Sequence, residues 1–242
     1  MSSRDGFRLP REGIVFLAVP DGAVSEMAAR IAGMHPSPKL SFVHLSGALG
    51  LDALAAIEPN PVGSFHPLQS FPFYRDQAAF RGITIAIDAT TPALLRALQQ
   101  LARRLGARPR KVADAERVRY HAAAVYASNF VDAVIAEAVH ELEAIGWTEA
   151  EATTALMPLV EGAVENIRRK GVVRAMTGPI RRGDEETVSH HLQAVERPDL
   201  YRILGSIALE IAQAAGLEPA AARRVRRALT RDVAATRRRK RS

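Results

Sequence analysis

Three segments in the N-terminal half carry residues that could bind a ligand or transfer a proton. They are Val19-Pro20-Asp21, His44-Leu45-Ser46-Gly47 and the run Gly63–Phe71, which contains His66. Each follows a short apolar run typical of a buried strand, and open α/β sheets bind ligands at the carboxyl ends of their strands. His66 could donate a hydrogen bond or shuttle a proton, and Gly47 would let a ligand approach the backbone. The alternatives are strand-to-helix turns and a structurally satisfied histidine.

A fourth segment runs from Tyr120 to Asn129 within a helical pattern. His121, Val125 and Ser128 are spaced at i, i+4 and i+7, so they share one helical face. Because polar side chains are costly to bury unpaired, this face should meet a partner, water or a ligand. A satisfied polar pair in the core is the alternative.

A fifth segment, Thr177-Gly-Pro-Ile-Arg-Arg-Gly-Asp184, joins a Gly-Pro turn to two guanidinium groups and a helix start. Arginine offers a planar fork for a carboxylate or phosphate, and a helix start adds amide donors. The alternative is a capped loop whose arginines face solvent. The sequence contains no cysteine and no metal-binding motif, which excludes disulfides and thiolate catalysis and predicts no metal site.

The elements that position these segments change character along the chain. Strands are expected at 14–19, 40–45, 62–66 and 83–87, with a last one around Val112, and helical stretches lie between them. This alternation predicts an α/β fold with a parallel sheet. The sequence is helical from about 114 onward, with one long helix to 145 and another, capped by Thr148, that should kink or break at Pro158 and Gly162. The boundary is expected at the polar stretch 107–113.

Composition restricts the possible partners. The 242 residues are 48% hydrophobic and 24% charged, which is ordinary for a globular protein. The net charge of +7 comes from the basic tail, because residues 221–242 hold ten Lys/Arg and one Asp, which leaves −2 for the rest. Without interleaved aromatic residues, the tail at 233–242 is expected to be solvated and not to bind nucleic acid. Short apolar runs and a polar start predict a cytoplasmic protein that does not contact a membrane.

Taken in order, the five segments resemble a bacterial family that pairs a Rossmann-like oxidoreductase domain with a C-terminal domain of unknown function, number 2520. The resemblance spans about residues 12–215. That family is similar to the 6-phosphogluconate dehydrogenase-like group, which includes pyrroline-carboxylate and ketopantoate reductases. It implies a partial NAD(P)-binding domain at 1–112 and a helical domain at 113–232 that forms a homodimer.

The resemblance also implies roles for individual residues. The cofactor NAD(P) would lie along Val19, Pro20, Ser46 and Gly47. His66, His121 and Asn129 would be catalytic, with His66 or His121 as the proton donor. Ser128, Thr177 and Arg182 would bind a small acidic substrate, a carbonyl or imine compound that exchanges hydride with the cofactor.

The chain departs from the family at its front. Members open with a strand, the loop G-x-G-x-x-G, a helix and a second strand, and the 242 residues contain no such loop. Strand 14–19 is therefore expected to correspond to an inner strand, in a truncated form or one with a misassigned start. Losing the loop that binds the pyrophosphate should weaken cofactor binding. The alternative function is a non-catalytic module that binds a small anion or forms a dimer.

Overall fold

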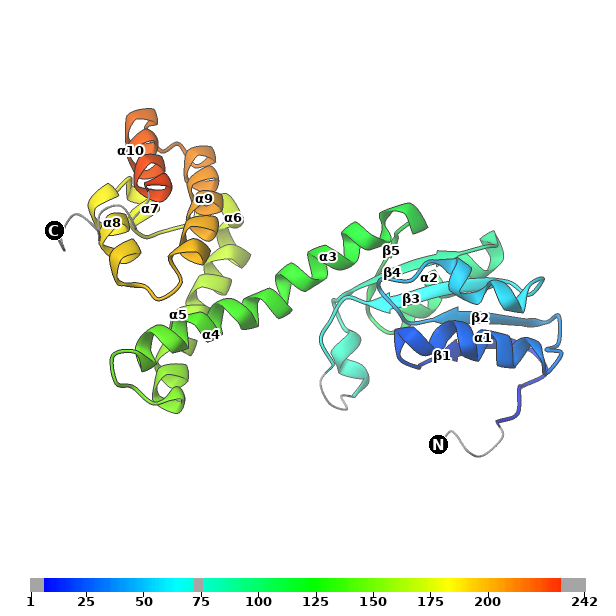
Figure 1. Cartoon of the computed structure of the whole chain (residues 1–242). Coiled ribbons are helices and arrows are strands. Elements are labelled where there is room, and N and C mark those ends of the chain that lie inside the picture. Colours follow the sequence, from blue (N-terminus) through cyan, green and yellow to red (C-terminus); the bar gives the residue numbers. More distant parts are fainter. Residues whose placement is uncertain (1–6, 72–75, 232–242) are drawn as a thin grey trace. The chain divides into compact units, whose positions relative to one another are not determined.

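The computed structural model describes residues 7–71 and 76–231, and the basic tail at 233–242 lies outside them. The chain divides into two compact units, Met1–Asp132 and Ala133–Ser242. The first unit contains the sheet and the second is helical, so the α/β class followed by an all-α part is confirmed (Figure 1).

A five-stranded sheet forms the first unit. Its strands are β1 (Gly13–Leu17), β2 (Leu40–His44), β3 (Val62–Pro67), β4 (Thr84–Ala89) and β5 (Arg108–Lys111), and they lie in that order. β1, β2 and β3 are parallel, β4 is antiparallel to β3, and β5 is parallel to β4. The sheet is therefore mostly parallel, with one reversal. A parallel β3–β4 pair would need a crossover, and the described part of that connection holds only the short η3 (Gln77–Phe80).

β5 occupies the stretch that the sequence analysis interpreted as a polar boundary. Arg108–Lys111 pairs with 84–87, and Val112 extends the ladder by donating its amide to the Ile87 carbonyl at 3.1 Å. The polar side chains and Pro109 suit this position, since β5 is the last strand in the sheet order and proline is tolerated at a sheet edge.

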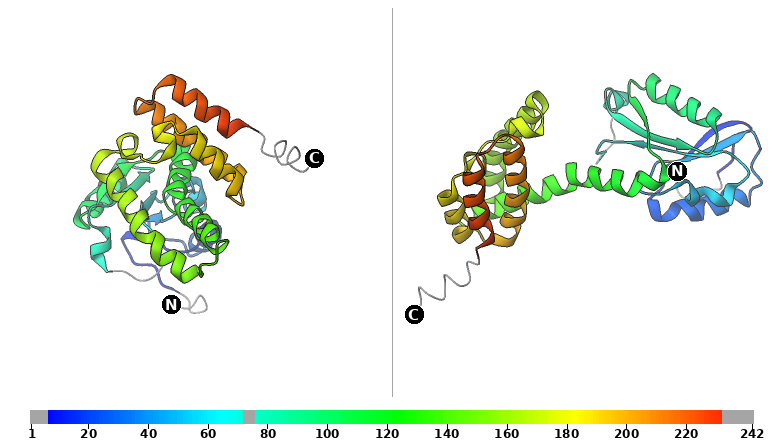
Figure 2. Two further views of the ribbon diagram at one scale, coloured as in Figure 1. Left: turned by 90° about the vertical axis from the view of Figure 1, so that its left-hand side faces the viewer. Right: turned by 90° about the horizontal axis from the view of Figure 1, so that it is seen from above.

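Helices cover both faces of the sheet. On one face, α1 (Val24–Ala32) and η2 (Leu51–Ile57) pack with Leu40 and Phe42 of β2. On the other, α2 (Pro92–Arg104) buries Leu98 against Val43 and Ile87. Phe42 and Val43 are neighbours on one strand, and alternate strand residues point to opposite faces. Figure 2 shows α1 and α2 on opposite sides of the sheet.

The long helix expected at 114–145 forms with one interruption. It consists of η4 (Asp114–Glu116), α3 (Arg117–Ala127) and α4 (Asn129–Glu143), and the backbone leaves helical geometry at Ser128. Contrary to the expectation from short apolar runs, 114–143 is long and apolar enough to cross a membrane, and only 6% of its most apolar window is buried. Length and composition are the whole of that signal, and no other described helix passes the same test.

The second unit is a cluster of helices. It comprises most of α4, then α5 (Glu149–Lys170), α6 (Val172–Ala175), α7 (Pro179–Arg182), α8 (Glu185–Ala194), α9 (Pro198–Ala214) and α10 (Pro219–Thr230). Val188, Leu209 and Val225 are at the centre of its core. The cap at Thr148 is confirmed, because its hydroxyl accepts from the Glu151 amide.

The break expected at Pro158 and Gly162 does not occur. α5 continues from 149 to 170 through both residues. Proline removes one backbone donor and leaves the carbonyl of Thr154, four residues earlier, without its helical partner. Thr154 is exposed, so water can hydrogen-bond to that carbonyl.

Candidate functional site

The loops that follow β1 and β2 are joined by a serine. The Ser46 hydroxyl donates to Asp21 Oδ2 at 2.7 Å and accepts from the amides of Ala48 and Leu49 at 3.1 and 3.0 Å. Since β1 and β2 are parallel, both loops lie at the same edge of the sheet. The Ser46 side chain therefore shapes this edge. Among the other residues assigned to the cofactor, Val19 packs against the core and Pro20 is exposed.

His66 lies between a tyrosine and a glycine at this edge. Its Nδ1 is 2.9 Å from the Tyr120 hydroxyl, and the two rings meet edge to face. On the other side, a Cβ atom placed on Gly47 would lie 2.8 Å from both Cε1 and Nε2 of the imidazole. Gly47 thus leaves the space that the His66 ring fills. Two of the segments found in the sequence, 44–47 and 63–71, meet here.

This contact predicts the effect of Gly47→Ala. The added methyl group would force the His66 ring away from its place against Tyr120, because no real Cβ contact is that short. We expect the variant to lose the His66–Tyr120 hydrogen bond and about 1 to 3 kcal/mol of stability. Nitrogen chemical shifts of the His66 ring and denaturant unfolding would measure both effects. An unchanged His66 spectrum would contradict this arrangement. Gly22→Ala is the matched control, since nothing lies within 4 Å of a Cβ there.

Burial keeps both members of the pair uncharged. Burial lowers the pKa of His66, as do the neighbouring His121 and Arg117, while Asp21 opposes them. Burial raises the pKa of Tyr120, and Arg117 opposes that shift. At pH 7 the pair is therefore a neutral imidazole and a phenol, and each group has one hydrogen to donate and a lone pair to accept with. Such a pair can pass a proton along its hydrogen bond.

A polar cluster lies fully buried beneath this edge. His44 and Ser64 are opposite each other on β2 and β3. Arg117 of α3 contacts Ser64 and has no exposed surface. The Arg117 guanidinium donates to the Ser64 hydroxyl, and its Nε donates to Asp114 Oδ1 at 3.1 Å. Asp114 also accepts the Leu51 amide at 2.9 Å. Among the described residues, Nη1 of Arg117 and both ring nitrogens of His44 have no hydrogen-bond partner.

Buried His44 and half-buried His66 predict a loss of stability in mild acid. Burial, followed by the charge of Arg117, lowers the pKa of His44 from 6.5, and the pKa of His66 is also lowered. Below about pH 6.5 the unfolded chain takes up protons that the folded chain does not, so unfolding becomes more favourable. Each unit of pKa difference contributes up to about 1.4 kcal/mol. Urea unfolding at pH 7.5, 6.5 and 5.5 should show the decline. His44→Met should reduce it, and an equal slope in that variant would contradict the assignment to His44.

One open pocket collects four of the predicted site residues. It measures about 580 Å³ and is lined by His66, Tyr120, His121, Ser128, Asn129 and Asp132 together with small residues of α3. Val125 lines it too, so the face predicted from the spacing of His121, Val125 and Ser128 does border one cavity. The Ser128 hydroxyl is partly engaged, because it donates to the Ala124 carbonyl at 2.8 Å and lies 3.2 Å from Asn129 Oδ1.

The remaining predicted residues, Thr177 and Arg182, line a pocket of about 630 Å³ within the second unit. The two guanidinium groups of this segment differ. Arg181 donates to the Ala215 carbonyl at 3.0 Å. The Arg182 side chain is 65% exposed, and its ion pair with Asp184 is long, at 4.0 Å. Arg182 is therefore the better placed of the two to meet an anion.

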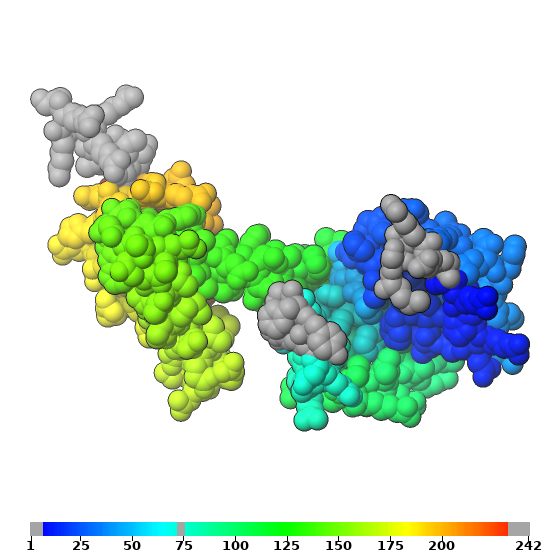
Figure 3. Space-filling model, turned by 90° about the horizontal axis from the view of Figure 1, so that it is seen from below, coloured from blue at the N-terminus to red at the C-terminus, as the bar shows by residue number. Residues whose placement is uncertain are grey.

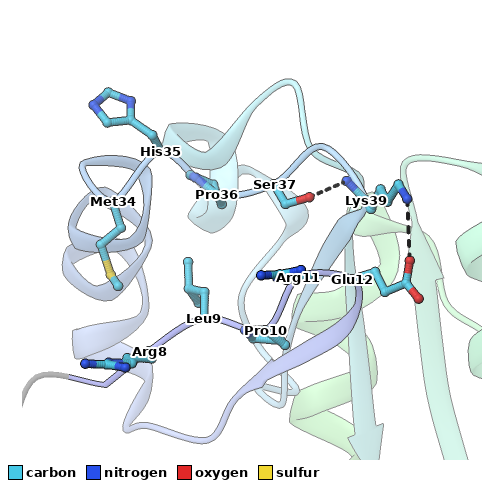
Figure 4. A pocket seen from close by; sticks show the side chains of 10 residues that line it. All are labelled: Arg8, Leu9, Pro10, Arg11, Glu12, Met34, His35, Pro36, Ser37 and Lys39. Carbon is cyan, nitrogen blue, oxygen red and sulfur yellow. Dashed lines mark hydrogen bonds and ion pairs between the residues drawn. The ribbon is translucent and has the colours of Figure 1, made fainter.

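A third pocket, of about 790 Å³, lies at the start of β1 and β2, opposite the edge that carries His66 (Figure 4). Lys39 is paired with Glu12 at 3.7 Å, and His35 points away from the cavity. The charged side chains of this third pocket do not converge on one point, unlike the polar side chains around His66. No group of three His, Asp or Glu side chains in the described ranges is arranged to hold a metal ion.

Arg117 and its partners belong to the site although no sequence pattern marks them. Asp114 and Arg117 are three apart, a spacing that allows an ion pair on a helix. The pair alone gives no sign that Arg117 is buried against Ser64, a residue 53 positions away.

Comparison with known proteins decides the family. The model of the family described as "Domain of unknown function (DUF2520)" matches residues 83–208, which is more than half of the chain. The chain belongs to the DUF2520 family. No curated protein matches it.

Solved structures show what fold this DUF2520 protein shares. Protein TM1727 from Thermotoga maritima superposes with a TM-score of 0.72 at 23% identity, covering 86% of this chain and 81% of its own. BF3122 from Bacteroides fragilis, designated a candidate NADP oxidoreductase, gives 0.66 at 24% identity, with 84% and 75% covered. The 1-pyrroline-5-carboxylate reductase of Streptococcus pyogenes gives 0.55 at 14%, also with 84% and 75% covered. The DUF2520 protein therefore has the Rossmann-like fold of these proteins.

Proposed function

We propose that this DUF2520 protein is an NAD(P)-dependent oxidoreductase that transfers hydride to or from a small carbonyl or imine compound. The observation that carries the proposal is the neutral His66–Tyr120 pair beside Gly47, at the edge where β1, β2 and β3 end. Ligands of open α/β sheets bind at this edge, and the pair borders a pocket large enough for a small substrate. The fold shared with NADP-linked neighbours supports the same function.

The residues at this edge fit one end of the cofactor better than the other. Val19, Pro20 and the Ser46–Gly47 loop offer a backbone edge and an apolar side chain suited to a nicotinamide ring. A phosphate would need free backbone amides, but at this loop the amides of Ala48 and Leu49 already donate to the Ser46 hydroxyl. The nearby Asp21 carboxylate would also repel a phosphate. We therefore place the nicotinamide end here, and we assign the pyrophosphate to no described residue.

The proposed chemistry assigns a proton step to the His66–Tyr120 pair. When bound, the nicotinamide supplies or accepts the hydride. His66 holds a proton on one ring nitrogen and accepts on the other, and Tyr120 fixes Nδ1. When the second nitrogen, Nε2, gives its proton to a substrate oxygen or nitrogen, Nδ1 takes the Tyr120 hydroxyl proton, so the imidazole stays neutral and water reprotonates the phenolate. In the opposite direction Nε2 takes the proton, and the same transfers run in reverse. His121 and Asn129 line the same pocket and would orient the substrate.

Substrate binding is proposed for three further residues. Ser128 borders the His66 pocket, where its hydroxyl can contact a polar substrate atom. Thr177 and Arg182 would form a subsite for an acidic group within the second unit, since Arg182 is exposed and paired only loosely. The exposed Arg182 guanidinium would favour a small anion as its ligand. We further propose a cytoplasmic location and no nucleic-acid partner.

Binding of cofactor fragments tests the proposal. We would titrate the full chain with NADPH, reduced nicotinamide mononucleotide and adenosine 2′,5′-bisphosphate by calorimetry. NADPH and the mononucleotide should bind within about a factor of ten of each other, which is 1.4 kcal/mol, and the adenosine fragment should not bind. Failure of the mononucleotide to bind would overturn the oxidoreductase function. His66→Ala tests the site, and His191→Ala is its matched control in the second unit.

The surface of the second unit favours self-association, which we propose as a homodimer. Its helices expose many large apolar side chains: Val134, Ile145, Trp147, Leu159, Val164, Ile167, Val172, Val173, Ile203, Leu204 and Ile207. Figure 3 shows one face of this unit, formed largely by the residues coloured green to yellow-green, which include α4 and α5. Apolar surface of this extent marks an interaction site in a soluble protein. If the chain lacks catalysis, dimerisation would remain as its alternative function.

The homodimer gives a direct prediction. Ile203 and Ile207 are 61% and 50% exposed and lie one turn apart on α9. Charges at both positions would have to be desolvated in an interface, so Ile203→Asp with Ile207→Asp should convert a dimer into a monomer. Sedimentation equilibrium would measure the mass. Glu210→Asp, on the exposed surface of the same helix, is the control. A wild-type monomer at micromolar concentration would contradict the proposal.

A further inference from the structure

Two contacts tie the same helix to the same strand. Ser64 and His66 are two apart on β3, so their side chains lie on one face of the sheet. Arg117 and Tyr120 are three apart on α3, so they also share a face. Arg117 donates to Ser64, and Tyr120 hydrogen-bonds to His66 at 2.9 Å. The contacts therefore form two rungs between β3 and the start of α3.

The Arg117 rung is the buried one. Arg117 and Ser64 have no exposed surface, whereas His66 and Tyr120 are half-buried. Arg117 also joins Asp114, which accepts the Leu51 amide at the start of η2. One guanidinium thus joins β3 and η4, and through Asp114 it reaches η2. An arginine fork that bonds two partners in fixed directions restrains its neighbours more than a lysine could.

We propose that Arg117 is a positioning residue that clamps α3 onto β3 and thereby holds the Tyr120 hydroxyl against His66. The inference rests on the role proposed for His66, but it concerns only the geometry of this chain. Arg117 need not contact substrate or cofactor, because it lies beneath the pocket and is not among the residues that line it. Arg117 affects the reaction by holding the Tyr120 hydroxyl in position against His66.

The electrostatic surroundings of His66 are consistent with this role. The groups that act on its charge are Tyr120, His121 and Arg117 on α3, and Asp21 in the loop after β1. Arg117 is the permanent cation among them. A test of position must therefore keep that charge, and Arg117→Lys does so while it removes the planar fork.

The experiment is a double-mutant cycle on the titration of His66, followed by NMR of the full chain labelled with ¹⁵N-histidine. In the wild-type background, Tyr120→Phe should move the His66 midpoint by about 0.5 unit or more, since a hydrogen bond to the ring is lost. In the Arg117→Lys background the same substitution should move it by less than half as much. Ser64→Ala keeps the arginine and removes its hydrogen bond to β3, so it should reduce the Tyr120→Phe effect as Arg117→Lys does. If the lysine variant does not fold, the Ser64→Ala background tests the positioning role.

Controls separate position from general damage. Arg119→Lys changes an exposed residue of the same helix and should leave the full Tyr120→Phe effect in place. His191, whose Nδ1 is 2.8 Å from the Tyr201 hydroxyl, gives a second His–Tyr signal that should not change in any of these variants. An equal Tyr120→Phe effect in all backgrounds would overturn the positioning role. Since no cofactor is added, this result is independent of whether nicotinamide binds.

Discussion

Asp114→Ala should destabilise the protein by about 2 to 4 kcal/mol, more than removal of the buried arginine that it serves. Asp114 is the carboxylate partner of Arg117, whose side chain is 1% exposed. Without it, a guanidinium charge stays buried, and Ser64 is the one hydrogen-bond partner left to it among the described residues. The Leu51 amide also loses its acceptor. The Asp114 side chain is 45% exposed, so water compensates in part, and the expected loss is below that of a wholly buried pair.

Denaturant unfolding of a small series would measure this difference. Arg117→Met removes the buried charge together with its unpartnered nitrogen, so we expect a smaller loss than for Asp114→Ala. Asp114→Asn keeps an acceptor for Leu51 and should fall between the two. Glu116→Ala is the matched control from the same short helix, where an exposed carboxylate accepts one amide at 3.3 Å. A larger loss for Arg117→Met than for Asp114→Ala would contradict this view of the buried cluster.

His66→Ala should lower kcat/KM by about 10²- to 10⁴-fold, the contribution typical of a positioned proton donor or acceptor. The substrate for this assay would come from a panel of small ketones, aldehydes and cyclic imines, each screened for oxidation of NADPH. Tyr120→Phe keeps the ring and removes the hydroxyl that fixes Nδ1, so it should lower kcat/KM less than His66→Ala does.

His121 offers the decisive comparison, because it borders the same pocket and is the other histidine to which the sequence analysis assigned proton transfer. We expect His121→Ala to reduce activity less than His66→Ala. His191→Ala should leave activity unchanged. A severe loss in His121→Ala together with a mild one in His66→Ala would transfer the proton step to His121.

Much of the fold follows from local pattern. Strands β1 to β4 were predictable because buried β-strands are continuous apolar runs. The helix caps were predictable because Thr148 and Asp184 precede helical stretches. The shared face of His121, Val125 and Ser128 follows from helical periodicity alone. These features need only residues close together in sequence.

The rest depends on contacts between distant residues. The reversal at β4 is set by how the connection after β3 returns to the sheet, which apolar patterns do not encode. The last strand was expected around Val112, but its residues 108–111 are charged or proline, which an edge strand can expose and which also suit a boundary. Arg117 was missed because charged residues are mostly exposed, and its burial depends on Ser64 of β3.

The most direct measurement is the spectrum of the His66 imidazole while the full chain is titrated with reduced nicotinamide mononucleotide. If the nicotinamide lies at the ends of β1, β2 and β3, the His66 signals should shift and saturate, and those of His191 in the second unit should stay fixed. Gly47→Ala should abolish the shift, since it displaces the ring. A His66 signal that does not change at saturating nucleotide, or one that shifts equally with His191, would contradict a nicotinamide site beside the His66–Tyr120 pair.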